Sequence, residues 1–297
     1  MNKAVIKKIT KTIIKIAVSV AAIALVVSKI NISSTAETIC SAQWQWIIGA
    51  LLIYATSQVL SAMRINAIFK VIPFKLNSIV NLRLYWLGMF YNFFLPGGVG
   101  GDGYKIYYLH KHYKQSVKQL TTSIICDRLS GLIAISCYLL AFISALGSNI
   151  GIPYCQWAFI LIPLGSLAYR IFLRIFAKFV LVVRHKVLCY SGIIQGMQMM
   201  AAMFILFAIG ADGQIAEYLF LFFVSSIASA IPISMGGIGL RELTFVMGSQ
   251  YFGTNEDIAV SLSILFYTVS LISALPGAIF AFKTSLIGAD NTNAENE

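Results

Sequence analysis

The chain has 297 residues, of which 59% are hydrophobic and 11% are charged, and its mean hydropathy is +0.82. An ordinary soluble domain is about 45–50% apolar and about 25% charged. These values exclude a soluble globular protein, a disordered chain and a disulfide scaffold. They predict an all-α membrane protein that crosses the bilayer several times. No polar stretch is long enough for a soluble catalytic domain, so we expect no enzyme.

The chain carries 22 lysine and arginine residues against 11 aspartate and glutamate residues, a formal net charge of +11. The basic residues lie at the ends of apolar runs, which is the positive-inside pattern. We interpret this charge as a topology signal that also attracts anionic lipid, and we expect no nucleic-acid partner. The five cysteines form no CxxC pair and the three histidines have no ligand-like companions, so we expect no metal or other cofactor.

Six apolar runs predict transmembrane helices. The first follows a lysine-rich N-terminus and ends at Lys29 without a clear cleavage site, so we interpret it as a retained helix rather than a cleaved signal. The second opens on Trp44 and Trp46, which fit an interfacial aromatic belt. The fourth begins near Trp157 and becomes basic after Tyr169. The runs lie at about 12–30, 44–66, 120–146, 157 onward, 188–209 and 258–283, the last kinked at Pro276.

Two further apolar regions contain a break rich in proline and glycine. Residues 79–108 are interrupted by Leu95-Pro96-Gly97-Gly98-Val99-Gly100-Gly101-Asp102, and residues 215–252 by Ile231-Pro232-Ile233-Ser234-Met235-Gly236-Gly237-Ile238-Gly239. Proline removes a backbone donor and glycine adds backbone freedom, so both interrupt a helix. Each half is short for a full span. We therefore predict two re-entrant helical hairpins with tips near the middle of the membrane; two short tilted spans in each region are the alternative.

The charge distribution fits six spans and two hairpins with the N-terminus and the C-terminus cytoplasmic. The basic segments 3–15, 64–83, 105–118, 170–186 and Lys283 then all lie inside. The outer loops hold the acidic residues Glu37, Asp212, Glu217, Glu256 and Asp257, and Lys29 as their basic residue. The first hairpin enters from the inside and the second from the outside. We expect a single transmembrane domain over residues 1–287 and a disordered polar tail over 288–297.

The two breaks are alike, since Gly97-Gly98-Val99-Gly100 matches Gly236-Gly237-Ile238-Gly239. Broken hairpins of opposite orientation in two halves of a chain indicate an inverted-repeat transporter with a site near the midplane. The first N–H groups of each returning half-helix carry partial positive charge and fit an anion such as phosphate. Close helix packing is the alternative role of these glycines.

Charged residues lie beside both breaks and inside the third span. A charge well inside the membrane costs about 2.5–3.5 kcal/mol or more, so we expect each to have a partner. Salt bridges from Asp127 to Arg241 or from Arg128 to Glu242 are one interpretation, and headgroup contact is the other. The Asn92 amide is expected to satisfy the broken backbone or to touch the substrate. The predicted substrate-binding residues are Asn92, Pro96, Gly97, Gly98, Gly100, Gly101, Asp102, Lys105, Asp127, Arg128, Pro232, Ser234, Gly236, Gly237, Gly239, Arg241 and Glu242.

At these residues the chain resembles the flippase-like membrane family that includes the transmembrane part of lysylphosphatidylglycerol synthases. The match lies in Asn92-x-x-x-Pro96-Gly97-x-x-Gly100-Gly101-Asp102 and Pro232-x-Ser234-x-Gly236-Gly237-x-Gly239-x-Arg241-Glu242, and it extends over about residues 16–283. Lys105 departs from the arginine common in the family, which keeps the charge but loses the bidentate fork. The synthases add a soluble aminoacyl-transferase domain, whereas this chain ends at Glu297. The resemblance therefore implies lipid movement and not aminoacylation.

The expected partner is a membrane lipid with an anionic or phosphate headgroup, and the expected location is the plasma membrane, the inner membrane of a bacterium. Three other functions stay open. They are a membrane enzyme acting on a lipid phosphate, an ion channel or small-solute carrier, and the membrane subunit of a larger lipid-modifying complex. A homo-oligomer and a separate partner enzyme also stay open.

Overall fold

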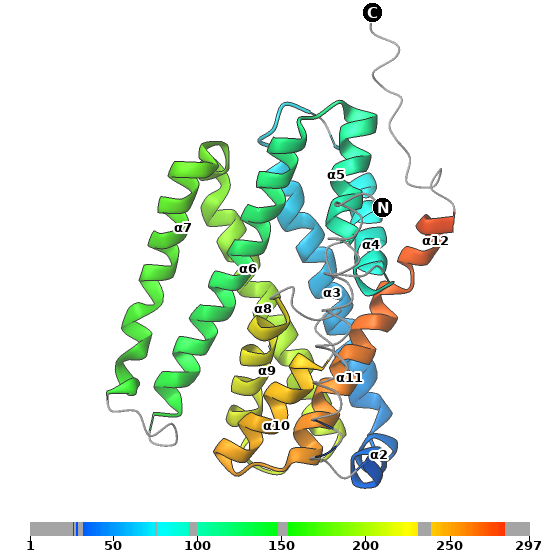
Figure 1. The fold of residues 1–297 in the computed structure, drawn as a ribbon, viewed down its shortest axis with the longest axis vertical. Helices are drawn as coiled ribbons and strands as arrows, with labels where there is room; N and C mark the ends of the chain where they lie inside the picture. The colour runs from blue at the N-terminus through cyan, green and yellow to red at the C-terminus, as the bar shows by residue number, and fades with distance from the viewer. Residues whose placement is uncertain are drawn as a thin grey trace, which may run out of the picture.

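The structure is a computed structural model that describes residues 26, 28, 32–74, 76–94, 100–147, 154–230 and 239–282 (Figure 1). The regular elements in these ranges are all helices, which confirms the expected all-α class. They are α2 (Ile32–Cys40), α3 (Trp44–Phe69), α4 (Ser78–Phe94), α5 (Gly100–Tyr113), α6 (Val117–Ala145), η1 (Cys155–Leu161), α7 (Ile162–Phe176), η2 (Lys178–Val183), α8 (Arg184–Ala208), α9 (Ile215–Ala230), α10 (Leu240–Phe252), α11 (Glu256–Ala274) and α12 (Gly277–Phe282).

Five helical stretches of the described chain are long and apolar enough to cross a membrane. They are Trp44–Phe69, Val117–Ala145, Cys155–Phe176, Lys178–Ala208 and Glu256–Ala274. These correspond to the second to sixth expected spans and confirm a polytopic membrane protein. The last expected span breaks at Pro276, as predicted, because α11 ends at Ala274 and α12 starts at Gly277. The first expected span, apart from residues 26 and 28, and the expected tail lie outside the described residues.

The two interrupted regions each form a pair of short helices. α4 has 17 residues and α5 has 14, and the two pack against each other. α9 has 16 residues and α10 has 13, and they also pack against each other. Each region thus contains two packed helices, with described bounds of 78–113 and 215–252 against the expected hairpin bounds of 79–108 and 215–252, and the re-entrant hairpins stay a prediction. The connecting residues 95–99 and 231–238 are not among those described.

The two helix pairs lie in opposite halves of the molecule, α4–α5 in the upper half of Figure 1 and α9–α10 in the lower half. The upper end is formed by the last turns of α3 and α5 and the first turns of α6 and α8, which carry Lys70, Lys111, Lys118 and Lys186. The lower end carries Glu37, Asp212, Glu256 and Asp257. The ends of the molecule thus differ in charge in the way that the sequence predicts.

The buried apolar side chains form two main clusters. The upper cluster joins the C-terminal half of α3 to α4, α5, α6 and α7 and includes Ile68, Leu84 and Leu120. The lower cluster joins the opposite halves of α3 and α8 to α9, α10 and α11 and includes Phe223 and Phe245. Between these clusters the long helices carry polar side chains.

Candidate functional site: a polar layer between two apolar clusters

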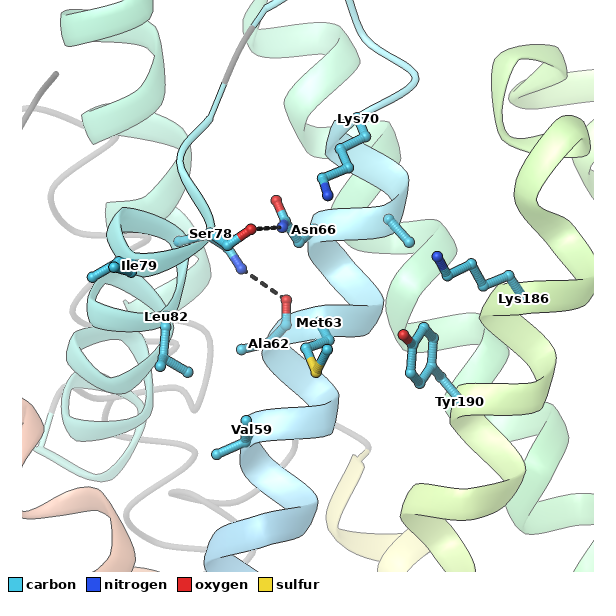
Figure 2. Close-up of a pocket in the computed structure, with 12 residues that line it drawn as sticks. Val59, Ala62, Met63, Asn66, Lys70, Ser78, Ile79, Leu82, Lys186 and Tyr190 are labelled. Atoms are coloured by element: carbon cyan, nitrogen blue, oxygen red, sulfur yellow. Dashed lines mark hydrogen bonds between the residues drawn. The ribbon is translucent and has the colours of Figure 1, made fainter.

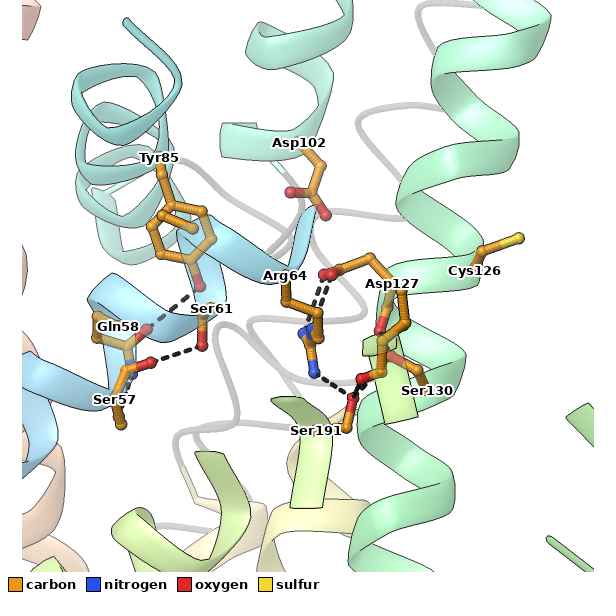
Figure 3. Close-up of polar contacts among 12 residues, drawn as sticks. Ser57, Gln58, Ser61, Arg64, Tyr85, Asp102, Cys126, Asp127, Ser130 and Ser191 are labelled. Carbon is orange, nitrogen blue, oxygen red and sulfur yellow. Dashed lines mark hydrogen bonds and ion pairs between the residues drawn. The ribbon is translucent and has the colours of Figure 1, made fainter. Parts of the chain in front are cut away.

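A layer of polar side chains separates the two apolar clusters on three helices. On α3, for example, the layer begins after Ala50 of the lower cluster and ends before Ile65 of the upper cluster. The polar layer consists of Ser57, Gln58, Ser61 and Arg64 of α3, Asp127 and Ser130 of α6, and Ser191 of α8 (Figure 3), together with the buried Gln195 of α8. Because such residues are costly in an apolar interior, each is expected to have a hydrogen-bond or ion-pair partner.

Arg64 and Asp127 form a two-point ion pair at the centre of this layer (Figure 3). Arg64 Nε donates to Asp127 Oδ1 at 2.8 Å, and Nη2 donates to Oδ2 at 3.0 Å. The third donor, Nη1, reaches Ser191 Oγ at 3.0 Å, and Ser191 is hydrogen-bonded to Ser130 at 2.9 Å. The two charged side chains are only 9% and 14% exposed. Removal of one member of such a pair would leave an uncompensated buried charge, which is strongly destabilising.

The start of α5 brings a second group of charges beside the layer. Asp102 Oδ2 accepts from Arg128 Nε at 2.6 Å, and its Oδ1 lies 3.5 Å from Lys105 Nζ. The Lys105 ammonium also lies 4.3 Å from the centre of the Tyr85 ring, a cation–π contact. Together with Arg64 and Asp127, three cations here face two carboxylates. The region around the first break therefore has one net positive charge.

The first break is held by a side-chain hydrogen bond and by close helix contact. Asn92 Oδ1 accepts from Gly101 N at 2.9 Å, so this amide satisfies the broken backbone, which was one of its two expected roles. A Cβ placed on Gly101 would lie 1.9 Å from the carbonyl oxygen of Gly88 on α4. Gly101 therefore allows α4 and α5 to touch, as the packing interpretation of the glycines requires.

The start of α10 at the second break is capped by its own carboxylate. Gly239 has φ of +86°, which favours glycine, and its N–H donates to Glu242 Oε2 at 2.7 Å. The other oxygen, Oε1, accepts from Ser263 of α11 at 2.9 Å. The Glu242 carboxylate thereby already binds a backbone N–H group at the start of α10. The N–H groups at this helix end carry the partial positive charge that was expected to attract an external anion.

Arg241 lies beside Glu242 and has weaker partners. Its Nη2 is 3.5 Å from Ser229 Oγ, and its guanidinium carbon lies 5.6 Å from the centre of the Phe266 ring. Among the residues that the structure describes, no carboxylate lies within ion-pair distance of this guanidinium. Arg241 is therefore the cation of this region with donors available for an anion.

Two residues one turn apart on α3 contact α4 and α11. Gln58 Oε1 accepts from the Tyr85 hydroxyl of α4 at 3.2 Å. Tyr54 contacts the Phe266 ring edge-on, with centroids 5.4 Å apart, and this is the ring beside Arg241. Tyr85 of the first helix pair and the ring that contacts Arg241 therefore lie against neighbouring turns of α3.

The structure describes ten of the predicted site residues and brings them to these two places. Asn92, Gly100, Gly101, Asp102, Lys105, Asp127 and Arg128 gather at the first break, and Gly239, Arg241 and Glu242 at the second. The remaining residues, Pro96, Gly97, Gly98, Pro232, Ser234, Gly236 and Gly237, are outside the described ranges.

The predicted salt bridges between the third span and the second break are wrong. Asp127 pairs with Arg64 and not with Arg241, and Arg128 pairs with Asp102 while Glu242 caps α10. The reason is packing, because α6 contacts α3 and α5, whereas α10 packs against α9 and α11. Arg64 itself was expected among the basic residues of an inner loop. Its position inside an expected span, where an arginine needs a partner, was the signal that could have identified it.

Residues 12–277 match the family model described as the lysylphosphatidylglycerol synthase TM region. The chain belongs to this family. The match includes both breaks and the whole polar layer, and it confirms the resemblance expected from the two glycine motifs. A similar protein, the UPF0104 membrane protein PH1989 of Pyrococcus horikoshii, is 24% identical over 85% of this chain and 91% of that protein. With its five described spans, this member of the transmembrane-region family is a multi-pass integral membrane protein.

Proposed function

We propose that this protein is a flippase that moves a lipid with an anionic or phosphate-linked headgroup across the membrane. The headgroup passes between the α4–α5 pair and the α9–α10 pair along the polar layer. The acyl or polyprenyl chains remain in the bilayer. The lipid leaves chemically unchanged, so the protein acts as a transporter and not as an enzyme.

The observation that carries this proposal is that Arg241 has no carboxylate partner among the described residues. The other cations near the layer have carboxylate partners: Arg64 has Asp127, and Arg128 and Lys105 share Asp102. Arg241 has one hydroxyl at 3.5 Å and an aromatic ring. A guanidinium whose planar fork of donors is available matches the oxygens of a phosphate or carboxylate.

The remaining charges support the same class of substrate. The first break has one net positive charge, and Arg241 adds another cation at the second break. The two breaks are linked through Tyr54 and Gln58 on α3. A second link is the contact between Phe93 at the end of α4 and Tyr267 of α11, whose ring centroids lie 5.3 Å apart. These contacts support a route along α3 and α11 from the first break toward Arg241.

We further propose that both termini are cytoplasmic and that the protein lies in the plasma membrane, the inner membrane of a bacterium. The α4–α5 pair then enters from the cytoplasmic side and the α9–α10 pair from the outer side, each as a re-entrant hairpin. The lysine-rich upper end and the acidic lower end of the molecule support this orientation. The helices of each pair, with 13–17 residues, are short for full spans.

The experiment is a flipping assay on purified protein in phosphatidylcholine vesicles that contain a trace of headgroup-labelled fluorescent phosphatidylglycerol. A membrane-impermeant quencher reports how fast the inner label reaches the outer leaflet. We expect wild type to accelerate this movement and Arg241→Gln to slow it by about tenfold or more, because a charged hydrogen bond is lost. Arg241→Lys keeps the charge without the fork and is expected to be intermediate.

Arg174→Gln is the matched control, since Arg174 is exposed on α7 and its loss changes the net charge equally. The proposal is wrong if wild-type vesicles behave like protein-free vesicles, or if Arg174→Gln is as slow as Arg241→Gln. An ionic current without lipid movement would instead favour the channel. A chemically altered lipid would favour the membrane enzyme.

A further inference from the structure

A groove separate from the polar layer lies near the basic end of the molecule. It covers the face of α3 between α4 and α8 and has a volume of about 260 Å³ (Figure 2). This is the size of a small headgroup rather than of a whole lipid. The lining residues are Val59, Ala62, Met63, Asn66, Ala67, Lys70, Ser78, Ile79, Asn81, Leu82, Lys186 and Tyr190.

Polar groups from all three helices gather at one end of this groove. Lys70 of α3 and Lys186 of α8 contribute two exposed ammonium groups, and Figure 2 shows Lys186 extending from α8 toward α3. The hydroxyls of Ser78 and Tyr190 stand on the α4 and α8 sides. The described lining residues include no carboxylate. Two ammonium groups without a lining carboxylate make this end attractive to an anion.

Asn66 adds a group that needs a hydrogen-bond donor. Its residue is 6% exposed, and its Nδ2 donates to Ser78 Oγ at 3.1 Å. Its Oδ1 is buried and has no hydrogen-bond partner among the described residues. In Figure 2 this oxygen points toward the same end of the groove as Lys70, which leaves α3 one turn later. A ligand that draws the flexible Lys70 side chain outward would give a donor access to this oxygen, and satisfying a buried acceptor is favourable.

The other end of the groove is apolar and open to the outside of the helix bundle. Met63 is 49% exposed, and Val59 and Leu82 line the groove beside it. The polar end is nearer the last turn of α3, and the apolar end lies further into the span. This order matches a lipid whose headgroup is at the membrane surface and whose chains enter the bilayer.

We propose that this groove is a second lipid site that binds a phosphate headgroup carrying a hydroxyl or ammonium donor. Lys70 and Lys186 hold the phosphate, the headgroup donor pairs with Asn66 Oδ1, and the chains lie along Met63 and Leu82. The site is distinct from Arg241 and the polar layer. It binds lipid at equilibrium whether or not the protein transports it.

The test is native mass spectrometry of the detergent-solubilised full chain titrated with defined lipids. Phosphatidylglycerol carries both the phosphate and hydroxyl donors, whereas phosphatidylmethanol carries the phosphate alone. We expect Lys70→Gln/Lys186→Gln to weaken phosphatidylglycerol binding by about tenfold or more. The control Arg170→Gln/Arg174→Gln removes two exposed charges from α7 and is expected to change binding by less than about threefold.

Asn66→Leu tests the second half of the proposal. Wild type is expected to prefer phosphatidylglycerol over phosphatidylmethanol, and the variant is expected to bind both equally, at the affinity of wild type for phosphatidylmethanol. Inorganic phosphate at millimolar concentration is not expected to displace the lipid. Circular dichroism and gel filtration check that each variant is folded.

Three results would overturn this inference. Equal phosphatidylglycerol binding by wild type and the lysine double variant excludes the groove as the site. Equal losses in the lysine and arginine double variants indicate non-specific charge attraction. Displacement by inorganic phosphate identifies a free anion as the ligand and not a lipid. Because the readout is binding, each result is independent of whether wild type flips lipid in the vesicle assay.

Discussion

Arg64 of α3 and Asp127 of α6, 63 residues apart in the chain, are joined by two parallel hydrogen bonds of 2.8 and 3.0 Å inside the helix bundle. This pair fixes α3 against α6 at the level where the two apolar clusters meet. Both helices also contact the first helix pair, since Gln58 of α3 bonds to Tyr85 of α4 and Arg128 of α6 pairs with Asp102 of α5. The ion pair therefore fixes the two helices against which the α4–α5 pair is positioned.

Removal of one member of this pair is expected to destabilise the protein strongly. Arg64→Met leaves the Asp127 carboxylate buried and unpaired, at a cost of about 3–5 kcal/mol in the free energy of unfolding. The double variant Arg64→Met/Asp127→Leu removes both charges and is expected to lie within about 1 kcal/mol of wild type. Denaturant unfolding in detergent micelles measures both. A single variant as stable as wild type would show that water reaches this carboxylate.

Gly101→Ala is expected to separate α4 from α5. The added Cβ would lie 1.9 Å from the Gly88 carbonyl oxygen, so the helices must move, which costs about 1–3 kcal/mol or more. Gly103→Ala in the same turn of α5 is the control, because no heavy atom lies within 4 Å of its added Cβ. Higher helix propensity is expected to make this second variant about as stable as wild type or slightly more so. Equal unfolding midpoints for both variants would contradict the close contact.

The hydrogen bond from Gly101 N to Asn92 Oδ1 predicts a loss of stability in Asn92→Leu. The variant leaves a partly buried backbone donor without its acceptor, which costs about 1–3 kcal/mol. Asn77→Leu is the comparison, since Asn77 Oδ1 caps Ile79 N at an exposed position where water can replace it. We expect the unfolding midpoint to fall further for the Asn92 variant. The reverse order would mean that Asn92 faces the substrate rather than the backbone.

The breaks in the two helix pairs were predictable from sequence because their causes are local. Proline and clustered glycine interrupt a helix wherever it packs, and the described helices α9 and α10 lie on either side of such a segment within the predicted bounds 215–252. The charge difference between the two ends was predictable for a similar reason, since it depends on the order of basic and apolar segments.

The partners of the buried charges were not predictable in this way. Asp127 was predicted to pair with Arg241, but it pairs with Arg64. Which of these two arginines it meets depends on which helix packs against α6. A single sequence contains no measure of that packing. Arg64 was additionally hidden because basic residues follow it toward Arg83, so it resembled the start of an inner loop.

The proposed orientation predicts which cysteines react from outside the cell. Cys40 is exposed at the end of α2 on the acidic side of the molecule. With Cys189→Ser removing the other exposed thiol, a membrane-impermeant maleimide is expected to label Cys40 in intact cells. In a Cys40→Ser/Cys189→Ser background, Lys114→Cys at the basic end is expected to react after permeabilisation alone. Labelling of Lys114→Cys in intact cells would reverse the orientation.

The capping of α10 by Glu242, and the sharing of Asp102 between Lys105 and Arg128, have a consequence for a working cycle. A carrier must return without its cargo, and bare charges inside the bilayer would make that empty form costly. In the proposed flippase, these internal carboxylates would take the place of the headgroup in the empty form. An arriving phosphate would bind Arg241 directly and would reach Lys105 and Arg128 by exchange with Asp102. Such exchange keeps affinity low and release fast, which favours turnover over retention.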